Sequence, residues 1–365
     1  MRKAIRKNVV GLIITSTVVF MSADYVHIQS VFVQLMNYSV LTFIVVYLTD
    51  FLRFTHTHYL FIFISLVIIT LHAFLINFDI LILIKYLLII FTLAMSLSPR
   101  KSIDAHSHSF FLYPWIIILS AGLYQLIMLT LNPALVLVSE HSRPIGFSVE
   151  PTFYSQQLLM FWLMSLLFCK RVNRFLLLFL EIVTVLLIMF CATRTSMLLA
   201  LPILGYRVVS QSARNLATMA VFSPFLVYYM SKINFGNLEI FFHKLNRLLN
   251  VSGEPREVAF YEMADMIGNS GLFGSGYKAV ESSVGLVIGS LYGNLTMSLY
   301  YTFGILIILP LFSVVIRIIF SGLTLKSVTF GYVILLSQVM PFLFTSFGLF
   351  VWIITASASR KVQRR

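Results

Sequence analysis

The sequence predicts an all-α polytopic membrane protein, with about twelve transmembrane helices and one large outer-face loop that contains short helices. Hydrophobic residues make up 59% of the 365 residues, charged residues make up 11%, and the mean hydropathy is +0.94. A soluble domain has far fewer apolar and far more charged residues. We therefore expect residues 1–365 to form a single integral membrane domain.

Apolar runs that are long enough, or nearly so, to cross a hydrocarbon core about 30 Å thick recur along the chain. The first run, Val9–Ser22, follows a cluster of cations and looks like a signal peptide. Its candidate cleavage site, Ser22-Ala23-Asp24, is weak, so we expect an uncleaved first helix. The other expected spans are Val31–Leu48, Tyr59–Ile76, Ile80–Ser98, Phe110–Leu131, Phe153–Cys169, Phe175–Ala192, Ser196–Val209, Leu216–Ile233, Phe303–Phe320, Val328–Phe344 and Phe347–Ala358.

The distribution of cations predicts the orientation of these spans. The formal net charge of +13 is spread between the apolar runs and is not gathered on one face, which argues against a nucleic-acid partner. Short cytoplasmic loops hold the excess of Lys and Arg, and a cytoplasmic N-terminus places most of the 26 cations inside. Both termini are then cytoplasmic. The cations left outside are Arg143, Arg194, Lys232, Lys244, Arg247, Arg256 and Lys278, with Lys85 inside a span.

A polar outer-face hinge loop, residues 132–152, separates two of the expected spans. Pro144 and Pro151 flank Gly146, so the backbone between them does not continue a helix. Non-helical backbone at membrane depth is either wet or buried in protein. Arg143 and Glu150 in this loop form either an ordinary interfacial salt bridge or part of a site for a charged substrate.

Residues 234–302 form the one region large enough for an extramembrane element, and we expect it on the outer face. Glu239–Val251 has the spacing of an amphipathic helix, which lies on the bilayer or acts as a lid. A second helix is expected from Glu254 to Ile267, ended by Gly268 and Gly271. The glycines that follow allow a tight turn and a close approach of the backbone to a ligand.

Four stretches carry a family resemblance. They are Arg143-Pro-Ile-Gly-Phe-Ser-Val-Glu-Pro-Thr152, the turn Ala192-Thr-Arg-Thr-Ser196, Arg256 one helix ahead of Gly271-Leu-Phe-Gly-Ser-Gly-Tyr277, and Asn294 followed by Tyr301-Thr-Phe-Gly304. Their order, with one large outer loop, resembles the Wzy-type O-antigen and capsular polysaccharide polymerases, relatives of the O-antigen ligases. The ligases place a histidine just before the asparagine, whereas Tyr292-Gly293 stand here, which weakens the ligase interpretation.

The resemblance implies a membrane glycosyltransferase of the bacterial cytoplasmic (inner) membrane. Such polymerases join oligosaccharide repeat units carried on undecaprenyl diphosphate, so the implied partners are this lipid-linked donor, membrane lipid and a chain-length regulator protein. A sugar hydroxyl attacks the anomeric carbon while the lipid diphosphate leaves. Guanidinium groups suit that leaving group, because they stay protonated and offer a planar fork to phosphate oxygens.

The expected catalytic residues are therefore Arg143, Arg194 and Arg256, with Glu150 as the base and His141 or His243 as weaker candidates. We expect no cofactor and no metal, because the carboxylates show no paired motif and Cys169 and Cys191 lie inside spans. The expected substrate-binding residues are His141, His243, Gly274, Gly276, Tyr277, Lys278 and Asn294.

Several alternatives stay open at this point. Arg194 could instead satisfy carbonyls at a helix end, and Arg256 and the two histidines could be ordinary surface residues. Lys85 and Glu181 lie inside spans, where an unpaired charge is costly. We expect either that the two residues pair with each other or that they face a polar cavity. The nearest alternative function is an O-antigen ligase. A lipid-linked oligosaccharide flippase or other transporter is a further one, although flippases lack a dominant outer loop.

Overall fold

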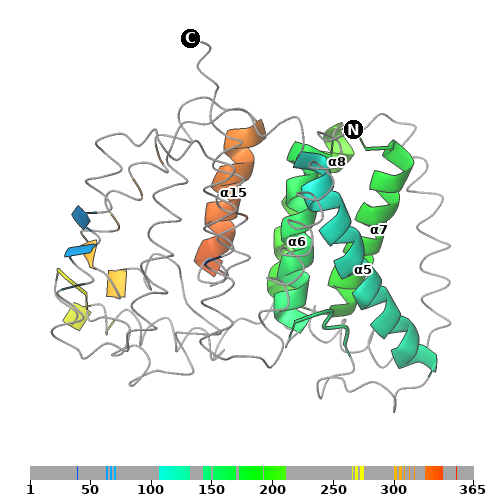
Figure 1. The fold of residues 1–365 in the computed structure, drawn as a ribbon, viewed down its shortest axis with the longest axis horizontal. Coiled ribbons are helices and arrows are strands. Elements are labelled where there is room, and N and C mark those ends of the chain that lie inside the picture. Colours follow the sequence, from blue (N-terminus) through cyan, green and yellow to red (C-terminus); the bar gives the residue numbers. More distant parts are fainter. Residues whose placement is uncertain are drawn as a thin grey trace, which may run out of the picture. The chain divides into compact units, whose positions relative to one another are not determined.

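The structure is a computed structural model of the 365-residue chain. The residues that it describes are 39, 63–64, 66–67, 70, 107–131, 143–148, 151–169, 172–191, 193–210, 265, 268–269, 272–274, 300–301, 304–305, 308, 312, 316, 325–339 and 351. Within these ranges the regular elements are all helices, and no strand occurs. The described helices are α5 (Ser107–Leu131), α6 (Pro151–Phe168), α7 (Arg174–Cys191), α8 (Arg194–Ser210) and α15 (Leu325–Val339) (Figure 1).

Helix α5, from Phe111 onward, belongs with α6, α7 and α8 to one compact unit of the chain, and α15 belongs to a second. Each of these helices coincides with an apolar run that predicts a span, so these predictions are confirmed as helices. The boundaries differ by a few residues: α5 begins at Ser107 rather than Phe110, and α8 begins at Arg194 rather than Ser196. Two of them are long and apolar enough to cross a membrane, over Phe111–Met128 and Arg174–Cys191.

Local sequence explains where these helices begin. Helix α6 starts at Pro151, whose missing N–H is no loss in the first turn and whose φ is already helical. The side chain of Asn173 precedes α7 and accepts a 2.9 Å hydrogen bond from the N–H of Phe175, as an N-cap does. Thr193 precedes α8, and its carbonyl accepts the first helical hydrogen bond, 3.1 Å from the N–H of Met197.

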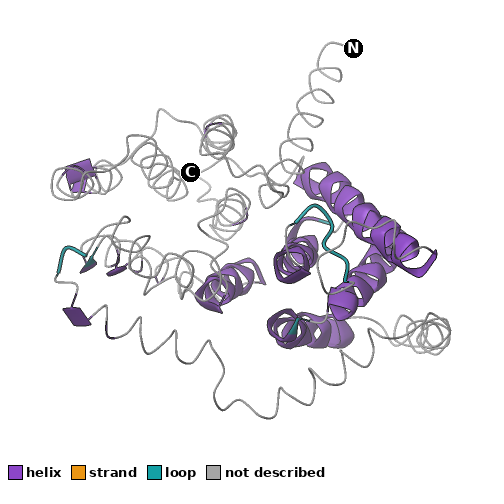
Figure 2. Cartoon of the chain, turned by 90° about the horizontal axis from the view of Figure 1, so that it is seen from below, coloured by secondary structure: helices purple, strands orange, loops and turns teal. Residues whose placement is uncertain are grey.

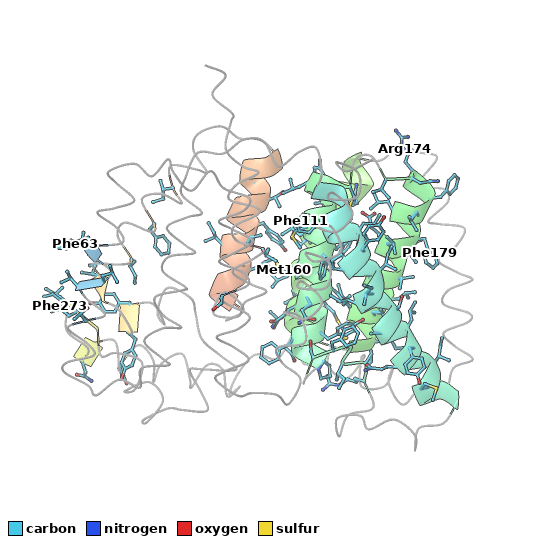
Figure 3. All side chains as sticks on the ribbon, viewed as in Figure 1. Phe63, Phe111, Met160, Arg174, Phe179 and Phe273 are labelled. Atoms are coloured by element: carbon cyan, nitrogen blue, oxygen red, sulfur yellow. The ribbon has the colours of Figure 1, made fainter. Side chains whose placement is uncertain are left out.

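Helix α6 forms the centre of its unit. It packs on both α7 and α8, which also pack on each other. Its side chains are buried almost without interruption from Tyr154 to Leu163. On α5, the buried Trp115 indole donates a 3.0 Å hydrogen bond to Thr184 Oγ1 of α7. Arg174 and Phe179 of α7, by contrast, are exposed: Figure 3 shows Arg174 at the end of the helix and Phe179 on the side that faces away from α6.

In the other unit, a glycine turn contacts a second glycine far along the chain. Gly274 follows a turn at Leu272–Phe273 and has a φ of 76°. The N–H of Ile305 donates to the Leu272 carbonyl at 3.1 Å, next to Gly304, whose φ is 72°. A Cβ on Gly304 would lie 2.2 Å from that carbonyl oxygen. The lack of a side chain at Gly304 therefore permits this close approach of two backbones, whereas the expected approach to a ligand stays a prediction.

One expected helix end is wrong. Gly268 was expected to end the second helix of the large loop, but Gly268 and Asn269 are both helical. The Asn269 side chain donates a 3.0 Å hydrogen bond to the Asp265 carbonyl, one turn back. A glycine tolerates a helical position at a modest cost in free energy, so a glycine by itself does not mark the end. Gly271 lies outside the described residues.

Candidate functional site

The described part of the hinge loop, Arg143–Ser148, folds as a tight turn at one end of the helices of its unit; we call it the hinge segment. In Figure 2 it is drawn as a loop running among these helices. The Ser148 N–H donates to the Ile145 carbonyl at 2.8 Å, and Gly146 has a φ of 57°. This left-handed conformation is strained for residues that carry a Cβ, which explains why a glycine stands there.

Gln125 of α5 holds the hinge segment through its carboxamide. Its Oε1 accepts hydrogen bonds from the N–H groups of Ile145 (2.9 Å) and Gly146 (2.8 Å). Its Nε2 donates to the Gly146 carbonyl at 2.8 Å. One side chain thus satisfies both backbone groups of Gly146 and the donor of its neighbour, which removes the cost of burying them unpaired.

Tyr154 of α6 fills the space between the hinge segment and α5. Its hydroxyl donates a 2.9 Å hydrogen bond to the Ile118 carbonyl, and its side chain is fully buried. A Cβ on Gly122 would lie 2.0 Å from the Tyr154 hydroxyl oxygen, and a Cβ on Gly146 would lie 2.3 Å from the ring. Glycine at both positions therefore lets the ring lie directly against the two backbones.

Arg143 crosses from the hinge segment to the end of α7. Its side chain is 7% exposed, and Nη1 donates a 3.0 Å hydrogen bond to the Cys191 carbonyl. The Cys191 thiol in turn donates to the Pro144 carbonyl at 3.4 Å. The last carbonyls of a helix lack intrahelical donors and carry partial negative charge, so a cation is stabilised there. Arg143 thus has the carbonyl-binding role that the sequence suggests for Arg194, whose own side chain lies outside the described residues.

The turn between α7 and α8 also binds α6 through a cluster of buried hydroxyls. Ser155 Oγ lies 2.7 Å from Thr193 Oγ1 and 2.8 Å from Ser196 Oγ. It also donates to the Thr152 carbonyl at 2.8 Å. Since a hydroxyl has one proton, Thr193 and Ser196 must both donate to Ser155. The turn is thus bound from one side by Arg143 and from another by Ser155.

Two buried oxygens near the start of α6 have no hydrogen-bond partner within the part of the chain that the structure describes. They are Ser148 Oγ in the hinge segment and Gln156 Oε1 in α6. Their residues are 2% and 6% exposed. Unpaired buried acceptors are uncommon and costly, so both oxygens are suited to accept a hydrogen bond from a bound hydroxyl or water.

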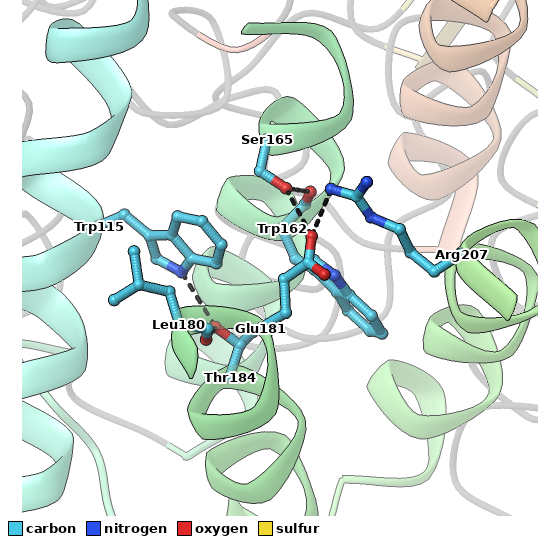
Figure 4. Close-up of polar contacts among 7 residues, drawn as sticks. All are labelled: Trp115, Trp162, Ser165, Leu180, Glu181, Thr184 and Arg207. Carbon is cyan, nitrogen blue, oxygen red and sulfur yellow. Dashed lines mark hydrogen bonds and ion pairs between the residues drawn. The ribbon is translucent and has the colours of Figure 1, made fainter. Parts of the chain in front are cut away.

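A second polar cluster, also within these helices, surrounds Glu181 of α7 (Figure 4). Its carboxylate is 2% exposed and pairs with the guanidinium of Arg207 in the last turn of α8. The Ser165 hydroxyl of α6 donates its one proton to the Trp162 carbonyl at 2.6 Å, and its oxygen lies 3.4 Å from the same carboxylate oxygen of Glu181. The partner of Glu181 is thus a cation from the next helix, and Lys85, the partner considered from sequence, lies outside the described residues.

Few of the sequence-predicted site residues can be placed. Arg143 is described in full, Gly274 lies in the turn described above, and Arg194 is the first residue of α8, with its side chain outside the description. The remaining predicted site residues lie outside the described residues: His141, Glu150, His243, Arg256, Gly276, Tyr277, Lys278 and Asn294. The structure therefore joins the hinge segment of Arg143 to the turn that leads into Arg194.

Four residues that hold these contacts are not among the site residues that the sequence predicts: Gln125, Ser155, Ser196 and Arg207. A lone amide inside the apolar run Phe110–Leu131 was the signal available for Gln125, because a polar side chain at such a position needs a partner. In the described part of the chain, no three His, Cys, Asp or Glu side chains gather as a metal site requires. Independence from metals stays a prediction.

Comparisons with protein-family models, with curated proteins and with solved structures find no match for this chain.

Proposed function

We propose that the chain is a polysaccharide polymerase of the bacterial inner membrane, which joins undecaprenyl-diphosphate-linked oligosaccharide repeat units at the outer face. The proposal includes about twelve spans, cytoplasmic termini and residues 234–302 outside, as the pattern of apolar runs and cations predicts. Two of the described helices are long and apolar enough to be such spans.

One observation carries the proposal: the buried guanidinium of Arg143 lies against Cys191, three positions before Arg194. Arg143 and Arg194 are two of the three arginines that we expect at the diphosphate. The contact that joins their segments, between Arg143 and Cys191, spans 48 positions of the chain. Their segments meet at one turn. A charge held in such a low-dielectric position acts on a nearby anion even where it does not touch it.

The chemistry follows from this concentration of positive charge. An acceptor sugar hydroxyl attacks the anomeric carbon of the donor, the bond from that carbon to the diphosphate oxygen breaks, and the diphosphate leaves with the bonding electrons. The hydroxyl proton passes to a base, for which we propose Glu150. Arg194 and Arg256 bind the departing diphosphate, and donors fixed in place before the reaction stabilise the developing charge most. Arg143 anchors the turn that carries Arg194.

The substrate-binding residues that we propose come from the hinge loop and the large outer loop. They are His141, His243, Gly274, Gly276, Tyr277, Lys278 and Asn294. The unpaired buried oxygens of Ser148 and Gln156 also support a polyhydroxylated ligand, because each can accept a hydrogen bond from a sugar hydroxyl.

The test is polymer synthesis by purified protein supplied with lipid-linked repeat units. Arg194→Ala and Arg256→Ala should each lower the rate by about 10²–10³-fold, the usual effect of losing one preorganised donor. Lysine at either position should recover part of the rate, because it keeps the charge but loses the planar fork. Arg174→Ala is the matched control, since Arg174 is exposed at the opposite end of α7.

Two results would overturn the proposal. Wild-type chain lengths from both Arg194→Ala and Arg256→Ala, at equal protein levels, would place the site elsewhere. Transfer of a finished chain to lipid A core, with no elongation of repeat units, would make the protein a ligase.

A further inference from the structure

Gln125 lies outside the set of residues that the reaction itself requires, yet its three hydrogen bonds all go to the hinge segment. They reach the N–H of Ile145 and both backbone groups of Gly146. None reaches Arg143 directly. Any effect of Gln125 on Arg143 must therefore pass through the backbone of the segment.

That backbone path is short and stiff. Pro144 separates Ile145 from Arg143 and has a restricted φ, and its carbonyl accepts the hydrogen bond of the Cys191 thiol. Tyr154 lies against Gly146 from the other side, so the segment has little room to adjust. A shift of Ile145 and Gly146 would therefore be transmitted to Arg143 and its contact with the Cys191 carbonyl.

Glutamine is well suited chemically to this position. Oε1 receives two N–H groups while Nε2 supplies the proton that the Gly146 carbonyl needs. Glutamate would keep both acceptor contacts and lose the donor. Asparagine has the same polar atoms on a side chain one methylene shorter, and leucine has none of them.

We infer that Gln125 is a positioning residue of the proposed transfer reaction: its carboxamide fixes the hinge segment in the conformation that brings Arg143 to the turn before Arg194. This inference rests on the proposed function. A displacement of about 1 Å in a reacting geometry can cost about 10²-fold in rate. Gln125→Leu therefore lowers kcat by about that factor. Gln125→Glu, whose second oxygen faces the Gly146 carbonyl, and Gln125→Asn, which is one methylene shorter, do not recover it.

The position of the hinge segment has its own reporter in the native thiol of Cys191, which is 0% exposed and bonded to Pro144. In a Cys169→Ala background, alkylation by N-ethylmaleimide measures how often this contact opens. We expect Gln125→Leu to speed alkylation at least about tenfold, while Tyr124→Ala, an exposed neighbour on α5, leaves it unchanged.

The two measurements separate the two claims. If the wild-type protein makes no polymer, the proposed function fails. The alkylation rate still tests whether Gln125 holds the hinge segment in place. Equal alkylation of Gln125→Leu and wild-type protein overturns the inference. Faster alkylation with unchanged kcat per folded molecule also overturns it, because Gln125 would then hold a loop that the reaction does not need. A purely structural role would lower the amount of folded protein and leave kcat per folded molecule unchanged.

Discussion

Arg207 in the last turn of α8 forms an ion pair with Glu181 of α7. The Arg207 side chain is 16% exposed and the Glu181 side chain is 2% exposed. Because α7 and α8 are antiparallel neighbours, both residues lie roughly 15–20 Å from the turn that joins them, at 1.5 Å per residue. The pair thus joins the middle of α7 to the last turn of α8, well away from the Cys191–Arg143 contact.

Removing one partner of this pair should destabilise the protein strongly. Arg207→Leu leaves the Glu181 carboxylate buried without its cation, which typically costs about 3–5 kcal/mol. The double variant Arg207→Leu/Glu181→Leu should lose much less, because no charge is left buried. Thermal unfolding in detergent measures both, with exposed Arg174→Leu as the control. Additive losses in the double variant would show that the pair contributes nothing as a pair.

Gly122→Ala and Gly146→Ala should each reduce stability, since either new methyl group would overlap Tyr154. Overpacking of this kind typically costs about 1–3 kcal/mol, and Gly146→Ala adds backbone strain at its φ of 57°. Gly205→Ala in α8 is the matched control, because a Cβ there meets nothing within 4 Å. It should leave the melting temperature unchanged or raise it. A drop at Gly205 equal to that at Gly122 would contradict the steric explanation.

The proposed topology predicts that a cysteine at Ser252 reacts with a membrane-impermeant maleimide in intact cells from which the outer barrier has been removed. Cys169→Ala and Cys191→Ser remove the native thiols, and serine keeps a donor for the Pro144 carbonyl. A cysteine at Ser102, in a loop expected inside, should react after permeabilisation alone. The opposite pattern at the two sites would invert the membrane orientation.

Purified protein should polymerise lipid-linked repeat units equally fast with and without an excess of chelator. The physical reason is that arginines, which carry a permanent charge, can neutralise a diphosphate without a bound cation. The measurement is chain length on gels with and without chelator. Loss of activity that Mg²⁺ or Mn²⁺ restores would make the metal, and not the arginines, the main electrophile.

The positions of the described helices could be predicted because an apolar run of sufficient length has few alternatives to a helix. The partners of polar side chains could not, because they depend on which helices become neighbours. Glu181 was expected to pair with Lys85 or to face a polar cavity, and its partner is Arg207. The antiparallel arrangement of two consecutive spans would have suggested that pairing.

The hinge illustrates the same limit. Pro144, Gly146 and Pro151 predict a break between helices, and the break is observed. The contacts of Gln125 and Arg143 require α5, α7 and the loop to be placed together, which local patterns do not specify. The sequence indicates only that the end of an α-helix needs donors or a cation, not which residue supplies it. The structure shows Arg143 in this role, while the side chain of Arg194 lies outside the described residues.

The contacts of the hinge segment also imply an order of assembly during synthesis. Gln125 bonds to residues 20 and 21 positions later, so that contact can form as soon as α6 begins to emerge. Arg143 must wait for Cys191, 48 positions further on. Until α7 has been made, its guanidinium lacks that acceptor. The hinge segment can therefore take its bonds to α5 before α7 exists, which makes the insertion of α7 the step that supplies Arg143 with the Cys191 carbonyl.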